Sequence, residues 1–120
     1  MKQLFIIAVM TFSLSAYGQQ KNVIKQRKML KDFAFCACMS NELKKDSVAI
    51  LNEGSESGYI ELSSYDVEAF EKVRQFAFSW VDKQKFKSYN NSKLIYMKCI
   101  KFYNSPDLLK FIVGLDKYIH

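Results

Sequence analysis

The stretch Ser92-Lys-Leu-Ile-Tyr-Met-Lys-Cys-Ile-Lys-Phe-Tyr103 decides the fold that we expect, because it sets a cysteine within a helical apolar stripe. Ile95, Cys99 and Phe102 are spaced i, i+4 and i+7, which places their side chains on one face of an α-helix, with Leu94, Tyr96 and Tyr103 flanking that face. A second stripe of this kind lies upstream, at Leu30, Phe33, Ala34, Ala37 and Cys38. The two stripes predict a pair of helices clamped together from opposite ends of the sequence.

The N-terminal segment, residues 1–18, has the three parts of a secretory signal peptide. Lys2 is its charged part, Leu4 to Met10 its apolar part, and Ala16-Tyr17-Gly18 its small-residue end. We expect cleavage after Gly18 and an exported mature domain of residues 19–120. The apolar run is shorter than the ~20 residues that cross a bilayer, and no later segment comes closer. No membrane span is therefore predicted in the mature chain.

The size and charge of the chain limit the possible classes of protein. A mature chain of about 100 residues is the usual size of one domain. The formal net charge of +6 falls to about +5 without Lys2, and lysines supply nearly all of the positive charge, since Arg27 and Arg74 are the only arginines. Proteins that bind nucleic acid favour arginine and clustered basic patches. We therefore predict no nucleic-acid partner; in an exported protein, positive charge of this size reflects either solubility or an acidic or anionic partner.

The three cysteines are expected to include a disulfide, because disulfides persist in the oxidising compartments that exported proteins reach. Cys36 and Cys38 lie about 200° apart around a helix, so only one of them can face the core. The apolar stripe favours Cys38 as the partner of Cys99, although the sequence alone leaves Cys36 as an alternative. A bond from Cys38 to Cys99 closes a loop of about 60 residues, worth roughly 4 kcal/mol in the chain-entropy model.

The rest of the chain predicts further helices and no sheet. Residues 21–45 read as one long helix; residues 46–64 read as a kinked helix or an ordered loop, with a turn or two at 47–51 and breaks at Gly54 and Gly58. Ser64 or Asp66 caps a helix that runs to about Asp82. Its apolar stripe is Val67, Phe70, Val73, Ala77, Trp80 and Val81.

A polar connection at residues 83–91 leads to the cysteine helix described above, and a last helix is expected after Asn104-Ser105-Pro106-Asp107. Ser105 is its N-cap and Pro106 its first residue, and its stripe comprises Leu108, Phe111, Ile112, Leu115 and Ile119. The predicted architecture is a small all-α bundle of about four to five helices stapled by one disulfide.

The sequence offers no catalytic constellation. His120, the single histidine, is the last residue, so a cysteine or serine nucleophile lacks its commonest base. Neither a glycine-rich phosphate loop nor metal-ligand spacing is present. Cys36-Ala-Cys38 is not the Cys-x-x-Cys of thiol oxidoreductases, and we interpret Cys36 as a spare buried thiol rather than a redox group. We predict no catalytic residue, cofactor or metal, and no enzyme.

Two groups of aromatic residues are distinguished by their position. Those on helical stripes are expected in the core: Phe33, Phe70, Trp80, Phe102 and Phe111. Those outside the stripes, or at their ends, suit a protein interface and packing equally well: Tyr59, Tyr65, Phe86 and Tyr89.

The order of these features resembles the immunity proteins that protect bacteria from type VI secreted cell-wall amidases, in the group paired with the fourth amidase class. The resemblance covers residues 30–118. It is carried by Lys31-Asp-Phe33 followed by Cys38, by Ser57-Gly-Tyr-Ile60, by Tyr65-Asp-Val-Glu-Ala-Phe70, and by Met97-Lys-Cys-Ile-Lys-Phe-Tyr-Asn-Ser105 leading to Leu108. It departs from the family at Cys36, which is additional, and at Asp66, where a proline is usual.

The resemblance implies a periplasmic all-α homodimer that binds a peptidoglycan amidase and obstructs its Cys/His active-site cleft with a protruding element. That amidase cuts peptidoglycan stems between D-glutamate and diaminopimelate. The family's disulfide pair falls on Cys38 and Cys99. The alternatives are a periplasmic helical binding or envelope-assembly module with an unrelated partner, and an enzyme with an unfamiliar site.

Two polar segments that join confident helices are the predicted partner-binding elements. The first runs from Glu61 to Tyr65 and the second from Lys87 to Lys93. The residues expected to contact the amidase are Glu61, Ser63, Ser64, Tyr65, Lys87, Tyr89, Asn90, Asn91 and Lys93.

Overall fold

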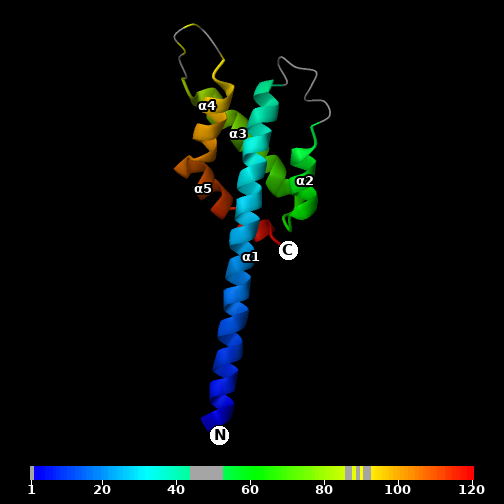
Figure 1. Cartoon of the computed structure of the whole chain (residues 1–120), viewed down its shortest axis with the longest axis vertical. Helices are drawn as coiled ribbons and strands as arrows, with labels where there is room; N and C mark the ends of the chain where they lie inside the picture. The colour runs from blue at the N-terminus through cyan, green and yellow to red at the C-terminus, as the bar shows by residue number, and fades with distance from the viewer. Residues whose placement is uncertain (1, 44–52, 86–87, 89, 91–92) are drawn as a thin grey trace.

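A computed structural model describes residues 2–43, 53–85, 88, 90 and 93–120, with side chains from Asn22 onward. The helical turn predicted at 47–51, and the residues Phe86, Lys87, Tyr89 and Asn91, lie outside the described residues. The described part contains five α-helices and one short 3-10 helix (Figure 1). They are α1 (Lys2–Leu43), α2 (Ser55–Leu62), α3 (Val67–Lys83), α4 (Ile95–Tyr103), α5 (Pro106–Val113) and η2 (Asp116–Tyr118). The predicted all-α class is confirmed.

Helix α1 is the axis of the molecule. It contacts each of the other four α-helices, and its N-terminal half projects beyond them (Figure 1). Helix α1 begins at Lys2 and not near Lys21, so the predicted signal segment and the predicted long helix form one unbroken helix. Cleavage after Gly18 stays a prediction. Within the described residues, no helix combines the length and the apolar character that crossing a membrane requires.

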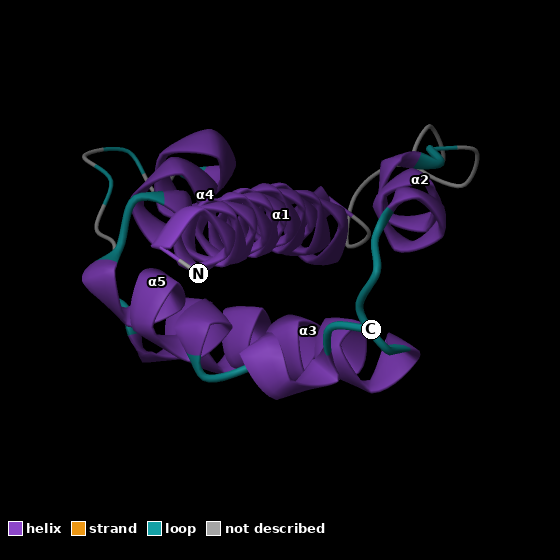
Figure 2. Ribbon diagram, turned by 90° about the horizontal axis from the view of Figure 1, so that it is seen from below, coloured by secondary structure: helices purple, strands orange, loops and turns teal. Residues whose placement is uncertain are grey.

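The bundle has two layers. Figure 2 shows α4, α1 and α2 in one layer and α5 and α3 in the other. The core between them is built by the predicted stripes: Leu30, Phe33, Ala34, Ala37 and Cys38 on α1 are buried against Phe70 and Val73 on α3 and Phe102 on α4. The rings of Phe33 and Phe70 meet edge to face at 4.8 Å.

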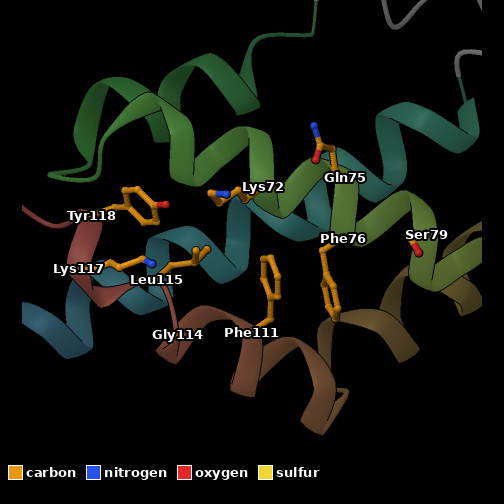
Figure 3. Close-up of a pocket in the computed structure, with 9 residues that line it drawn as sticks. All are labelled: Lys72, Gln75, Phe76, Ser79, Phe111, Gly114, Leu115, Lys117 and Tyr118. Atoms are coloured by element: carbon orange, nitrogen blue, oxygen red, sulfur yellow. The ribbon is translucent and has the colours of Figure 1, made fainter.

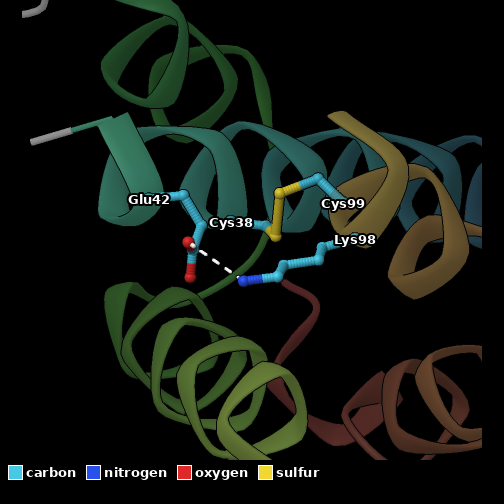
Figure 4. The surroundings of a disulfide bond; sticks show 4 residues. All are labelled: Cys38, Glu42, Lys98 and Cys99. Atoms are coloured by element: carbon cyan, nitrogen blue, oxygen red, sulfur yellow. Dashed lines mark ion pairs between the residues drawn. A yellow bond between two sulfur atoms is a disulfide. The ribbon is translucent and has the colours of Figure 1, made fainter. Parts of the chain in front are cut away.

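A disulfide joins α1 to α4 (Figure 4). It pairs Cys38 with Cys99, whose Cα atoms are 5.7 Å apart, and both residues are buried in the core. Cys36 is a free thiol, so the pairing left open between Cys36 and Cys38 is resolved in favour of the apolar stripe. Beside the disulfide, Nζ of Lys98 lies 3.8 Å from a carboxylate oxygen of the buried Glu42, which adds a second link between the same two helices.

Helix ends account for most differences from the predicted elements. Residues 55–62 form helix α2 despite Gly58, although the helix has no fully buried residue. Val67 was expected on the apolar stripe but is 66% exposed, as the first residue of α3. Asp66 precedes α3 as predicted, yet its side chain pairs with His120 and makes no cap hydrogen bond. At α5 the predicted cap is confirmed: the Ser105 hydroxyl accepts from the Leu108 amide at 3.2 Å.

Candidate partner-binding surfaces

The first predicted contact segment, residues 61–65, is tied to the bundle by hydrogen bonds. The side-chain oxygen of Gln26 on α1 accepts from the Ser64 amide at 2.7 Å and from the Ser63 hydroxyl at 3.2 Å. The Ser64 carbonyl accepts from the His120 amide at 2.9 Å. Glu61 is exposed at the end of α2. Most of the segment is therefore a strap between α2 and α3, held against α1 and the C-terminus.

Tyr65 is the buried part of this strap. It is 5% exposed, its ring meets Phe70 at 6.3 Å, and its backbone forms an isolated bridge with Ile119. Burial first, and the Asp116 carboxylate second, raise the pKa of Tyr65 to about 12, while Arg27 acts to lower it. Within the described residues, its hydroxyl has no hydrogen-bond partner. Of the two interpretations of this ring, interface or packing, the structure supports packing.

The C-terminal residues close the same corner of the molecule. Nε of Arg27 donates to Asp116 at 2.9 Å, and a second guanidinium nitrogen contacts the other carboxylate oxygen. This hydrogen bonding raises the pKa of Arg27 above its usual value. The Asp66 amide donates to the Tyr118 carbonyl at 2.8 Å. The chain end thereby fixes the strap between α2 and α3.

The second predicted contact segment follows the C-terminal end of α3 in the sequence, and the structure describes it only at Ser88, Asn90 and Lys93. Asn90 and Lys93 are described and both are exposed. Helix α3 has 17 residues between the two predicted segments, which separates them by about 25 Å at 1.5 Å per residue. The described residues of the two segments, 61–65 in the first and Ser88, Asn90 and Lys93 in the second, therefore lie toward opposite ends of α3.

Helix α4 carries an exposed apolar face directly after the second segment. Tyr96 is 67% exposed, Met97 43% and Ile100 52%, while Cys99 and Phe102 face the core. We call these three side chains the α4 face. The position of Tyr96 beside the buried stripe was expected, but its exposure was not, because the sequence does not show that α4 lies at the edge of its layer. Aromatic residues and methionine are enriched in protein interfaces.

A groove lies between α3 and the C-terminal part of the chain (Figure 3). Its floor contains Phe76 and Phe111, whose rings stack with centroids 4.2 Å apart, and Leu115. At one end, the indole nitrogen of Trp80 donates to the Asp107 carboxylate at 3.1 Å. The rings of Trp80 and Phe111, expected in the core, are partly buried and contribute to this wall.

Lysines surround the α3/α5 groove. Lys72, Lys83, Lys110 and Lys117 line it, and among the described lining side chains Asp107 is the single acidic one. The sequence analysis did not identify this surface, because its two walls come from helices that only the tertiary structure brings together. The feature of the sequence that could have indicated the groove is the set of lysines on α3 and α5, namely Lys72, Lys83 and Lys110.

The side chains considered for catalysis are dispersed. Cys36 lies half-buried on α1 near Tyr59 and Tyr103, and burial raises the pKa of its thiol, with further contributions from Glu53 and Glu56. A raised pKa keeps a thiol protonated and weakens it as a nucleophile. His120 pairs with Asp66 at the opposite corner. Among the described residues, no group of histidine, cysteine and acidic side chains has an arrangement suited to a metal ion.

The fold and these surfaces define a class of protein: a small disulfide-stapled helical domain with an exposed apolar helix face and a basic groove, both suited to contact with another protein. Comparison with protein families identifies the family. The model of Tai4, described as Type VI secretion system (T6SS), amidase immunity protein, matches residues 28–112, which is more than half of the chain. The protein belongs to this family of immunity proteins, and the resemblance seen in the sequence is confirmed. Comparisons with curated proteins and with solved structures gave no significant match.

Proposed function

We propose that the mature protein is a periplasmic immunity protein that binds its cognate type VI secreted peptidoglycan amidase and blocks the amidase active site. Blocking the enzyme protects the producing cell from peptidoglycan cleavage. Membership of the amidase immunity family supports the general role. In this role the chain acts by stoichiometric binding and catalyses no reaction of its own.

The observation that carries the proposal is the position of the α4 face. Tyr96, Met97 and Ile100 are exposed on the helix that directly follows the connection ending at Lys93. A polar connection beside exposed apolar side chains provides an interface with an apolar centre and a polar rim. We place the contact with the amidase at this end of the bundle, with Asn90 and Lys93 in the rim.

Inhibition of the amidase tests this proposal. Residues 19–120 are mixed with the amidase encoded beside the gene, and peptidoglycan cleavage is measured over a range of molar ratios. We expect stoichiometric inhibition. Replacing Ile100 with glutamate is expected to weaken binding by about tenfold or more, because a charge then replaces an apolar contact at the interface centre.

A matched control comes from the other end of the bundle. Val67 is also an exposed aliphatic residue, at 66%, so the change Val67→Glu is expected to leave inhibition unchanged. Equal effects of the two changes, with both variants folded by circular dichroism, would contradict the placement. Absence of inhibition by the wild-type protein would refute the function and leave an exported helical module with another partner.

Two further parts of the proposal concern assembly and export. We propose that the mature chain forms a homodimer, which sedimentation velocity tests directly: a single species of monomer mass at micromolar concentration would refute it. We also propose export with cleavage after Gly18. The intact mass of protein recovered from the periplasm then corresponds to a chain that begins at Gln19, and an uncleaved mass contradicts it.

A further inference from the structure

We infer that the α3/α5 groove binds an acidic segment of the amidase and seats an apolar side chain of that segment on the stacked rings of Phe76 and Phe111. This inference rests on the proposed function and adds a second contact, which contributes to the choice of amidase. Figure 3 shows the two rings side by side, with Leu115 beyond them and Lys72 and Lys117 at the same end.

The floor of the groove provides the apolar part of the site. Phe76 and Phe111 are only partly buried, although they pack against the core. Their rings stack with an interplanar angle of 6°, so the two facing sides cover each other and the ring edges supply the apolar lining between α3 and α5. Covering such a surface with an apolar side chain removes apolar area from water, which favours binding.

The rim of the groove provides the charge. The lone lining carboxylate, Asp107, is already engaged by the indole of Trp80. Within the part of the chain that the structure describes, Lys83 and Lys110 have no carboxylate partner. Lys72 lies 3.6 Å from Glu68, and the ammonium of Lys117 lies 5.3 Å from the centre of the Tyr118 ring. The excess of ammonium groups selects a partner segment with carboxylates.

The length of the groove limits the size of the segment. Lys72 and Lys83, both on α3, mark its two ends, and eleven residues of helix span about 16 Å. An extended segment of about five residues covers this distance. The groove also ends at Lys83, the last residue of α3, where the connection toward α4 begins. A single partner can therefore contact the groove and that connection together.

Charge reversal tests the ionic part of the inference. The variants Lys83→Glu and Lys110→Glu are compared with Lys25→Glu, which makes the same change at an exposed position of α1 outside the groove. Association with the amidase is measured by stopped-flow at 50 and 300 mM salt. We expect each groove variant to lower the association rate constant about fivefold at 50 mM salt and less at 300 mM, because salt screens electrostatic steering. The Lys25→Glu rate is expected to match the wild type.

Filling the groove tests the apolar part. Ser79 lines the groove and is exposed, so Ser79→Trp places a bulky ring in it without replacing a core side chain. We expect about tenfold weaker binding, mainly through faster dissociation, with unchanged thermal unfolding.

The outcomes separate this inference from the proposed function. If the wild type inhibits the amidase and all groove variants bind as it does, the groove inference is wrong and the function stands. Equal loss in Lys25→Glu also overturns it, because the effect then reflects total charge. If groove variants lose self-association in sedimentation but keep amidase binding, a second copy of the chain occupies the groove. Absence of wild-type inhibition overturns both proposals.

Discussion

Removal of the disulfide is the perturbation whose magnitude follows most directly from the structure. Cys38 and Cys99 are 61 residues apart in the sequence, and the bond between them restricts the unfolded chain. The chain-entropy model assigns a loop of this length about 4 kcal/mol at 25 °C. This value is a large part of the ~5–15 kcal/mol that stabilises a typical domain. We expect the double change Cys38→Ala/Cys99→Ala to lower the free energy of unfolding by about that amount.

Urea unfolding followed by circular dichroism at 222 nm measures this loss. The oxidised wild type, the reduced wild type and the double variant are compared at pH 7. We expect both disulfide-free forms to lose about 4 kcal/mol of unfolding free energy. In thermal unfolding, this loss corresponds to a melting temperature about 20 °C lower. Their m-values are expected to rise, because an unfolded chain without the cross-link exposes more surface.

Cys36 provides the control and the refutation. Cys36 is a half-buried free thiol, so Cys36→Ala is expected to change the free energy of unfolding by less than about 1 kcal/mol. A loss below about 1 kcal/mol in the double variant would refute the reasoning that the long loop dominates the effect. An equal loss in Cys36→Ala would refute the assignment of the effect to the cross-link.

Three further predictions concern the core, the strap and the C-terminus. In urea unfolding, Leu108→Ala is expected to lower the free energy of unfolding by about 2–5 kcal/mol, and Leu109→Ala by less than about 0.5 kcal/mol. The reason is that Leu108 is buried and Leu109 is 55% exposed. Equal losses would contradict the orientation of α5. Since the folded pKa of Tyr65, about 12, lies above the ordinary value of 10.0, its contribution to stability is complete below pH 10 and is lost as pH rises toward 12. Tyr65→Phe is therefore expected to flatten the fall in melting temperature above pH 10, and an unchanged profile would exclude Tyr65 as its source. A double-mutant cycle between Arg27 and Asp116, measured by urea unfolding, is expected to give a coupling free energy of about 0.5–1 kcal/mol, since both side chains are about a third exposed. Zero coupling would show that this ion pair does not stabilise the C-terminal residues.

Local spacing in the sequence was enough to predict the helical class and most of the core stripes, and to favour Cys38 over Cys36 as the partner of Cys99. Helical periodicity depends only on neighbouring residues, so Phe33, Phe70 and Phe102 could be assigned to the core without knowing how the helices pack. The cap at Ser105 was predictable for the same reason, because its hydrogen bond spans three residues. The family resemblance was also visible in the sequence, and the family comparison confirmed it.

The predicted contact segments show where local reasoning stops. The residues 61–65 are polar, which suggested an exposed element, but Gln26 and His120 bind this segment from distant parts of the chain. Tyr65 is consequently buried. The α4 face shows the reverse case: Tyr96 adjoins an apolar stripe in sequence, yet no other helix covers it within the described structure.

The sequence by itself determined the all-α class and the apolar side of the main helices, and it favoured Cys38 over Cys36, because each of these depends on spacing along one helix. The structure settled the pairing of Cys38 with Cys99. Only the tertiary structure decided that Val67 and the α4 face are exposed, that Tyr65 is buried, and that four lysines surround the Phe76 and Phe111 rings. The physical reason is that burial and clustering depend on which helices become neighbours, and the packing of the two layers around α1 sets those neighbours.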